Sequence, residues 1–76
     1  MPTMSSGGWQ ALLEAGRLVS AADVAEYIYG DGGKLSQARV YRMTRERLIP
    51  SVRIGRMVRY SPAAVQAWVD AGGTRL

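Results

Sequence analysis

The sequence contains no cysteine and no histidine. The chain therefore has no thiol nucleophile, no disulfide, no zinc site of the Cys/His kind and no histidine for acid–base chemistry. It has no apolar run near the roughly 20 residues that a membrane-spanning helix needs, and it does not begin with the basic and apolar segments of a signal peptide. These absences predict a cytoplasmic protein without a metal, a cofactor or a membrane partner.

The chain is also short. Its 76 residues predict one domain, and a domain of this size buries only about 60% of the surface that its unfolded chain exposes. A thin core leaves little room for a deep catalytic pocket. The only close acidic pair, Asp23 and Glu26, is explained by solvation of one helix face, and G-D-G-G-K-L-S lacks the spacing of a phosphate-binding P-loop. We therefore expect no enzyme, no catalytic residue and no small-molecule substrate.

Acidic residues are scarce in the middle of the chain. Residues 34–59 contain eight lysines and arginines and one acid, Glu46, a net charge of +7, whereas the remaining residues carry −3. A basic middle between mildly acidic flanks is typical of a protein that binds a polyanion such as nucleic acid. The alternative is a solvated basic face that only keeps a small protein soluble.

The first half of the chain predicts two helices. A flexible start over residues 1–8 precedes a short helix over residues 9–15, where Trp9 caps the core. The second helix covers residues 19–29, with Ser20 as its N-cap and Asp23 as the capping-box partner. The glycine-rich residues 30–33 end this helix.

Two more helices follow. One covers residues 36–47, with Ser36 as its N-cap. The last begins at Ser61 and Pro62, an N-cap and a first-turn proline, and ends at the glycines 72 and 73. The predicted fold is mostly α-helical, with three to four short helices and one small β-hairpin. The predicted core consists of Val24, Ile28, Val40, Ile49, Val58, Tyr60, Val65 and Trp68.

The hairpin is predicted over residues 52–60, V-R-I-G-R-M-V-R-Y, which alternate apolar and basic residues. Burial of all its alternating apolar residues on one face requires a three-residue loop, residues 55–57, and places Arg53 opposite Arg59. A two-residue turn suits Gly55 better but puts Val52 and Val58 on opposite faces. We expect the longer loop, because it satisfies the burial pattern.

Opposed arginines on neighbouring strands destabilise a hairpin. An anion between them would relieve the repulsion, and an arginine at the tip, Arg56, suits a minor groove, where negative potential is concentrated. Protection of an edge strand from pairing with other chains is the alternative explanation. We favour contact with phosphate, because lysine or a pair of opposite charges would protect an edge equally well.

Two helices joined by a short turn, the second with arginine, glutamine and tyrosine outside, describe a helix-turn-helix. Arginine suits guanine and glutamine suits adenine in the major groove. The predicted DNA contacts of this helix are Ser36, Gln37, Arg39, Tyr41, Arg42 and Arg45, and those of the hairpin are Arg53, Arg56 and Arg59. Lys34 and Arg47 are candidates for phosphate contacts. Arg42 is the strongest candidate for reading a base.

Four segments together resemble the excisionase-type helix-turn-helix family, a relative of the MerR-like winged-helix domain. They are L-V-S-A-A-D-V-A-E-Y-I (18–28), S-Q-A-R-V-Y-R-M-T-R (36–45), I-P-S-V-R-I-G-R-M-V-R-Y (49–60) and S-P-A-A-V-Q-A-W-V (61–69). The P-S-V-R-I-G-R block after V-Y-R is the most specific part. The resemblance covers about two-thirds of the chain. One departure is the connection between the two helices, which is a few residues longer than the tight turn usual in the family.

The resemblance implies a winged helix-turn-helix over residues 18–71, an N-terminal extension over residues 1–17 and a tail over residues 72–76. It implies an architectural protein of a bacterial host cell that binds repeated sites on double-stranded DNA beside a phage or plasmid attachment site. Such a protein self-associates cooperatively on DNA, bends it and directs a site-specific integrase toward excision. Two alternatives stay open: a small transcriptional regulator of the same fold, and an adaptor subunit of a DNA-packaging enzyme.

Overall fold

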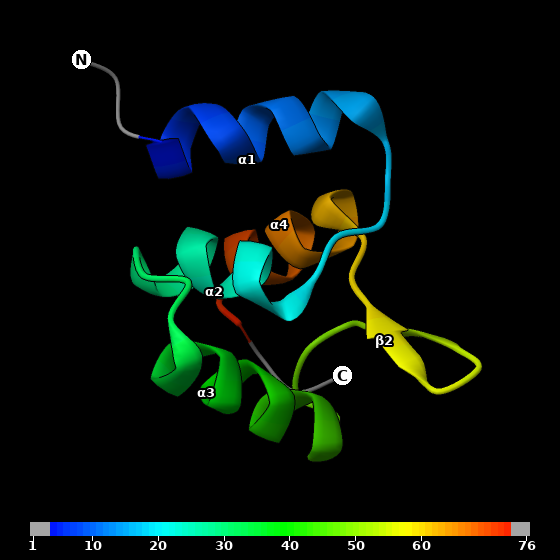
Figure 1. Ribbon diagram of the computed structural model, residues 1–76. Coiled ribbons are helices and arrows are strands. Elements are labelled where there is room, and N and C mark those ends of the chain that lie inside the picture. The colour runs from blue at the N-terminus through cyan, green and yellow to red at the C-terminus, as the bar shows by residue number, and fades with distance from the viewer. Residues whose placement is uncertain (1–3, 74–76) are drawn as a thin grey trace.

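The computed structural model describes residues 4–73, which form four helices and one two-stranded hairpin (Figure 1). The elements are α1 (Met4–Ala15), α2 (Ala21–Tyr29), α3 (Lys34–Arg45), β1 (Val52–Ile54), β2 (Met57–Arg59) and α4 (Pro62–Asp70). This arrangement confirms the predicted class, a mostly helical winged helix-turn-helix. Within residues 4–73, no helix is long and apolar enough to cross a membrane.

The predicted caps of α2 and α4 are confirmed. Ser20 Oγ accepts a hydrogen bond from the Asp23 backbone N–H at 3.3 Å, and the Ser20 backbone N–H donates to the Asp23 carboxylate at 3.2 Å. This reciprocal capping box satisfies two amide groups that have no partner inside the helix. Gly30 ends α2 in the left-handed conformation, and Ser61 Oγ caps α4 by accepting from the Ala64 N–H.

The start of α3 differs from the prediction. The helix begins at Lys34 with Gly33 as its N-cap, so Ser36 is not the cap but lies inside the helix, only 7% exposed. The reason is Asp31, whose carboxylate accepts hydrogen bonds from the Gly33 N–H at 2.9 Å and from Ser36 Oγ at 3.4 Å. An earlier helix start shortens the connection to residues 30–33, which is an ordinary length for a helix-turn-helix.

The connection is also held in place. Gln37 Nε2 donates to the Gly32 carbonyl at 2.8 Å, and a Cβ at position 32 would lie 3.0 Å from the Ala22 carbonyl oxygen. A side chain there would force the loop away from α2. The loop after α2 is therefore a fixed turn that sets the angle between α2 and α3.

The hairpin register is not the one predicted from the burial pattern. Ile54 pairs with Met57 and Arg53 with Val58, so the turn has two residues, Gly55 and Arg56. Gly55 has a φ of 60°, which suits the first central position of a tight hairpin turn. The local turn geometry prevails because the short ribbon extends from the core and does not need to bury both strands.

This register separates the two arginines that were expected to face each other. Arg53 lies on the inner face with Val58, and Arg59 lies on the outer face opposite Val52. Three apolar side chains are left exposed on the outer face: Val52, Ile54 and Met57. The prediction that Arg53 and Arg59 oppose each other is therefore wrong, and their repulsion gives no support for phosphate binding.

The base of the hairpin is joined to the segment that precedes α2. Val19 and Tyr60 exchange two backbone hydrogen bonds, of 2.8 and 2.9 Å, in an antiparallel bridge. Both side chains are buried. The bridge fixes the position of the hairpin relative to the helix pair.

The core lies between α2, α3, α4 and the base of the hairpin. The predicted core residues Val24, Val40, Ile49, Tyr60 and Val65 are buried, whereas Ile28, Val58 and Trp68 are only half-buried against them. The list of predicted core residues did not include Val19, Ala21 and Ala25, which are also buried. Small residues on α2 allow its neighbours to approach closely.

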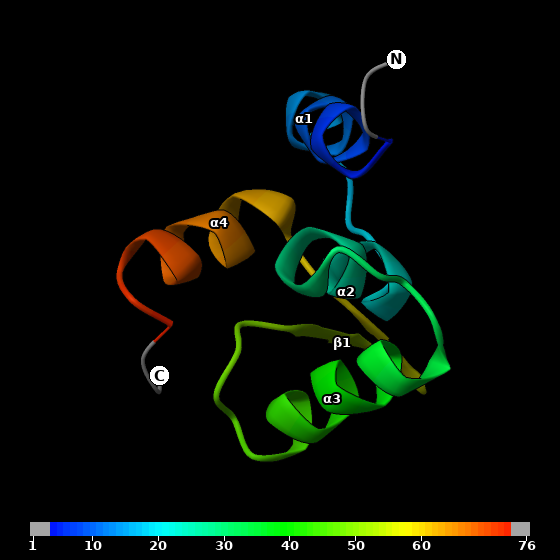
Figure 2. The ribbon, with the colours of Figure 1, turned by 90° about the vertical axis from the view of Figure 1, so that its left-hand side faces the viewer.

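Helix α1 packs on this core on the side opposite to α3 (Figures 1 and 2). Trp9 stacks on Tyr27 of α2 with ring centroids 4.1 Å apart, and its Nε1 donates to Gln66 Oε1 of α4 at 3.1 Å. The core-capping role of Trp9 is confirmed. Helix α1 begins at Met4, five residues before the predicted start at residue 9. Docking through Trp9 offsets the low helix propensity of two glycines. Residues 1–3 and 74–76 of the predicted ends lie outside the described residues.

Tyr60 also joins the hairpin to α3, and the burial of its hydroxyl gives a testable pH dependence. Thr44 Oγ1 donates to the Val40 carbonyl at 2.8 Å, which leaves it to accept from the Tyr60 hydroxyl at 2.7 Å. Burial raises the pKa of Tyr60 above its ordinary value of 10.0. We expect the free energy of unfolding to fall as the pH rises above about 10, because the unfolded chain loses this proton first.

The variant Tyr60→Phe tests this expectation. It should lower the free energy of unfolding by about 1 kcal/mol at neutral pH, because one buried hydrogen bond is lost. It should also flatten the decline above pH 10, although burial likewise raises the pKa of Tyr27. Urea denaturation at pH 7 and pH 10.5 measures both effects, and an unchanged pH dependence would exclude Tyr60 as its source.

Candidate nucleic-acid interface

Helix α3 presents one face to the core and the opposite face to solvent. Ser36, Val40 and Met43 point inward, and the successive 100° steps of the helix place Ala38, Arg42 and Arg45 on the far side. Figure 1 shows α3 on the outside of the molecule, with only its upper side covered by α2. Among residues 4–73, the side chains of this outward face are exposed.

The arginines of this face are held loosely. Arg42 Nε lies 3.4 Å from the Glu46 carboxylate, one turn away, with 73% of the arginine side chain exposed. Exposed pairs of this kind contribute about 0–1 kcal/mol, so Arg42 leaves Glu46 at little cost. Arg39 lies at the edge of the face, with its guanidinium 5.6 Å from the ring centroid of Tyr29 on α2.

Two predicted contacts of α3 do not lie on this face. Ser36 is buried with its hydroxyl on Asp31, and it cannot reach DNA without unfolding the first turn. Gln37 is half-buried, and its amide is used on the Gly32 carbonyl. These two residues build the turn that holds α3, and the prediction of Ser36 as a DNA contact is corrected accordingly.

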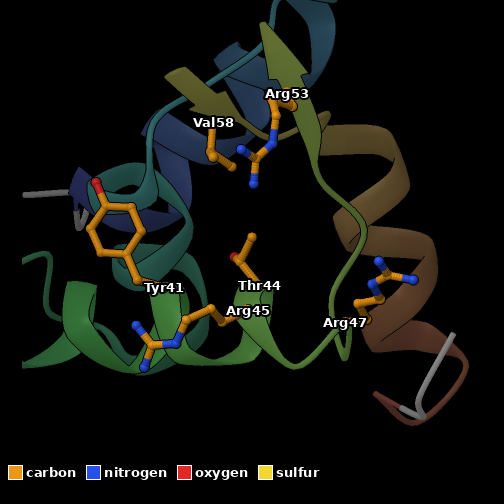
Figure 3. Close-up of a pocket in the computed structure, with 6 residues that line it drawn as sticks. All are labelled: Tyr41, Thr44, Arg45, Arg47, Arg53 and Val58. Atoms are coloured by element: carbon orange, nitrogen blue, oxygen red, sulfur yellow. The ribbon is translucent and has the colours of Figure 1, made fainter. Parts of the chain in front are cut away.

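A cleft of about 420 Å³ lies between α3 and the hairpin. Its lining residues are Tyr41, Thr44, Arg45, Arg47, Arg53 and Val58. Three arginines from three segments of the chain thus surround one opening, and no carboxylate is among the lining residues. In Figure 3 the guanidinium of Arg53 points from the hairpin into the opening toward α3. The guanidinium groups of Arg45 and Arg47 lie on opposite sides of the opening and point away from each other. This arrangement gives the opening a border of positive charge that attracts anions.

The other basic residues of the hairpin lie away from this cleft. Arg56 is exposed at the turn, as predicted for a residue at the tip. Arg59 folds back along its own strand on the outer face, where its guanidinium donates to the Val58 carbonyl at 2.9 Å. Lys34 is exposed in the first turn of α3. The structure therefore brings Arg45, Arg47 and Arg53 together and leaves Arg59 apart.

A family model, described as a helix-turn-helix domain, matches residues 34–73, just over half of the chain. The chain belongs to the helix-turn-helix domain family. The matched segment begins with α3 and includes the hairpin and α4, whereas α1 and α2 precede it. Searches of the curated proteins and of the solved structures returned no significant match.

In a helix-turn-helix domain the second helix of the motif enters the major groove while the first crosses the backbone. In this member of the family α2 and α3 are those two helices. Membership supports sequence-specific DNA binding, and the outward face of α3 is the surface available for it.

Arg47, which lines the cleft, lies just after the recognition helix α3, and the end of this helix is unusual. Its backbone N–H donates to the Thr44 carbonyl and that of Leu48 to the Met43 carbonyl, the two bonds of a Schellman motif. The central position of this motif is left-handed and normally glycine, yet Arg47 occupies it with a φ of 58°. A non-glycine residue there costs about 1–2 kcal/mol. The strain at this position motivates the hypothesis that the arginine side chain has a role at the cleft.

The variant Arg47→Gly separates that role from stability. We expect it to raise the free energy of unfolding by about 0.5–1 kcal/mol, because relief of strain exceeds the added chain entropy of glycine. The same variant should bind DNA several-fold more weakly, because a cleft cation is lost. Thermal unfolding and fluorescence anisotropy measure the two effects. Unchanged DNA affinity in a stabilised variant would show that Arg47 does not contact the backbone.

Proposed function

We propose that the protein is an excisionase, a sequence-specific architectural protein that binds repeated sites near a phage or plasmid attachment site. The observation that carries the proposal is the cleft between α3 and the hairpin, which Arg45, Arg47 and Arg53 line. The sequence resemblance supports the finer assignment, because the P-S-V-R-I-G-R block forms β1 and the turn beside this cleft. The protein would act on DNA in the cytoplasm of a bacterial host cell.

The proposed mechanism involves binding and bending, and no chemistry. Arg42 reads base edges from the major groove, while the cleft arginines neutralise a phosphate and release its counterions. Arg56 extends the basic surface toward the adjacent backbone or minor groove. A bend of the site costs of order 1–6 kcal/mol, which the contacts along α3 and the hairpin offset. The bent DNA then allows a site-specific integrase to assemble the excision complex.

Two alternatives make different use of the same surface. A small transcriptional regulator would bind DNA to control a promoter, and an adaptor of a packaging enzyme would hold DNA without reading it. Cooperative self-association on DNA belongs to the excisionase proposal, because tandem sites place neighbouring copies in contact. The arrangement of the preferred sites therefore distinguishes the three functions.

Selection of bound duplexes from a random library at near-physiological salt, followed by sequencing, tests the proposal. Tandem repeats in one direction are the expected result for copies that bind head to tail. A palindrome would instead favour a dimeric regulator. Absence of enrichment, with binding that disappears as salt increases, would favour the adaptor.

A further inference from the structure

Leu35 is an unexplained residue on the outward face of α3. It lies in the first turn of the helix and is 82% exposed, although leucine is among the residues most often buried. It contributes almost nothing to the core. Packing in the core therefore does not account for the leucine at this position.

The neighbours of Leu35 indicate what it meets. On a helix, residues 35, 38 and 42 share one face, because they are separated by three and four positions. That face thus carries a leucine, an alanine and the exposed Arg42, with Lys34 beside them. A protein partner that covered Leu35 would also have to accept these cations, whereas the major groove presents acceptors and apolar groups together.

We propose that Leu35 reads the 5-methyl group of thymine. This inference rests on the proposed DNA binding and adds a specificity-determining residue to it. In the major groove thymine is distinguished by its methyl group, the one apolar feature of a base edge. Ala38, one turn further, has a side chain short enough for the helix backbone to lie close to the bases. Arg42 lies about two turns of α3 after Leu35, so the two side chains contact different base pairs of one site.

Replacement of thymine by deoxyuridine tests the contact, because it removes the methyl group and keeps every hydrogen-bonding group. Each thymine of the duplex selected by the wild-type protein is replaced in turn, and the Kd is measured by fluorescence anisotropy for the wild type and for Leu35→Ala. At one or two positions we expect deoxyuridine to weaken the wild type roughly four-fold, the value for burial of one methyl-sized group. The same replacement should change the affinity of Leu35→Ala by less than about 1.5-fold.

Two controls make the result specific. Leu35→Ala should unfold at the same temperature as the wild type, since the leucine is exposed and alanine favours a helix. Leu18→Ala removes another partly exposed leucine, one that lies outside α3, and should keep the full sensitivity to deoxyuridine. This pair distinguishes loss of a base contact from a general loss of apolar surface.

The inference is overturned if no thymine is sensitive to deoxyuridine, or if the wild type and Leu35→Ala lose the same factor at every position. Either result, together with a clear preference for the selected duplex over a scrambled one, would overturn the role of Leu35 alone. Equal binding of selected and scrambled duplexes would overturn the proposed function, and the inference with it.

Discussion

Replacing Trp9 with alanine is expected to lower the free energy of unfolding by about 3–5 kcal/mol, the usual range for a buried tryptophan. Trp9 is buried, stacks on Tyr27 and donates to Gln66. The variant loses all three of these contributions. Since domains are stable by only about 5–15 kcal/mol, and small ones by less, much of the variant should be unfolded at 37 °C.

The control for this variant is Gln10→Ala, one residue further along α1. Gln10 is exposed, and its amide donates only to the Glu14 carboxylate at 3.3 Å, so its removal should change stability by less than about 0.5 kcal/mol. Circular dichroism during thermal unfolding compares the two variants. If Trp9→Ala were no less stable than Gln10→Ala, α1 would be a dispensable extension and not part of the folded unit.

Replacing Arg45 and Arg53 together with alanine is expected to weaken DNA binding by roughly 30- to 1,000-fold at about 0.15 M salt. Both residues line the cleft without a carboxylate beside them, and each charge-assisted contact contributes about 1–2 kcal/mol. The loss should be equal on selected and scrambled duplexes, because phosphate contacts carry no sequence information. The slope of log K against log salt should fall by about 1.8, or 0.9 for each phosphate contact.

Arg59→Ala is the matched control, since it removes an arginine from the same hairpin. Its guanidinium lies on the outer face and donates to its own strand. We expect a loss of affinity below about three-fold and a nearly unchanged salt slope. If Arg59→Ala weakened binding as much as the double variant, net charge and not the cleft would account for the affinity.

Features that depend on neighbouring residues could be predicted from the sequence. The capping box of Ser20 and Asp23 needs only two residues three positions apart, and the proline and serine that begin α4 are equally local. The exposed arginines of α3 followed from the helical period. The resemblance added the winged helix-turn-helix arrangement, which no single segment specifies.

The errors arose where one rule was applied without the competing contact that decided the outcome. The hairpin register was wrong because the burial pattern assumed a core on one side of both strands, whereas β1 is exposed and Gly55 sets the turn. The start of α3 was wrong because Asp31 uses the hydroxyl of Ser36. Sequence patterns also do not show the cleft, because its three arginines come from α3, the loop after it and β1.

Leu35 was overlooked for a related reason. An apolar residue in a predicted helix is usually assigned to the core, and the predicted start at Ser36 left Leu35 outside the helix. With α3 beginning at Lys34, Leu35 lies two turns before Arg42 on the outward face. The available signal was its spacing of seven residues from Arg42, which is recognisable once the helix start is known.

Interference by dimethyl sulfate methylation tests the central claim most directly, because it modifies guanine N7 in the major groove and adenine N3 in the minor groove of the selected duplex. The account predicts that N7 methylation of at least one guanine prevents binding of the wild type, and that Arg42→Ala loses this sensitivity. Sequence-preferring binding that is indifferent to methylation at every N7 would contradict the account, because Arg42 could not then be reading guanine in the major groove.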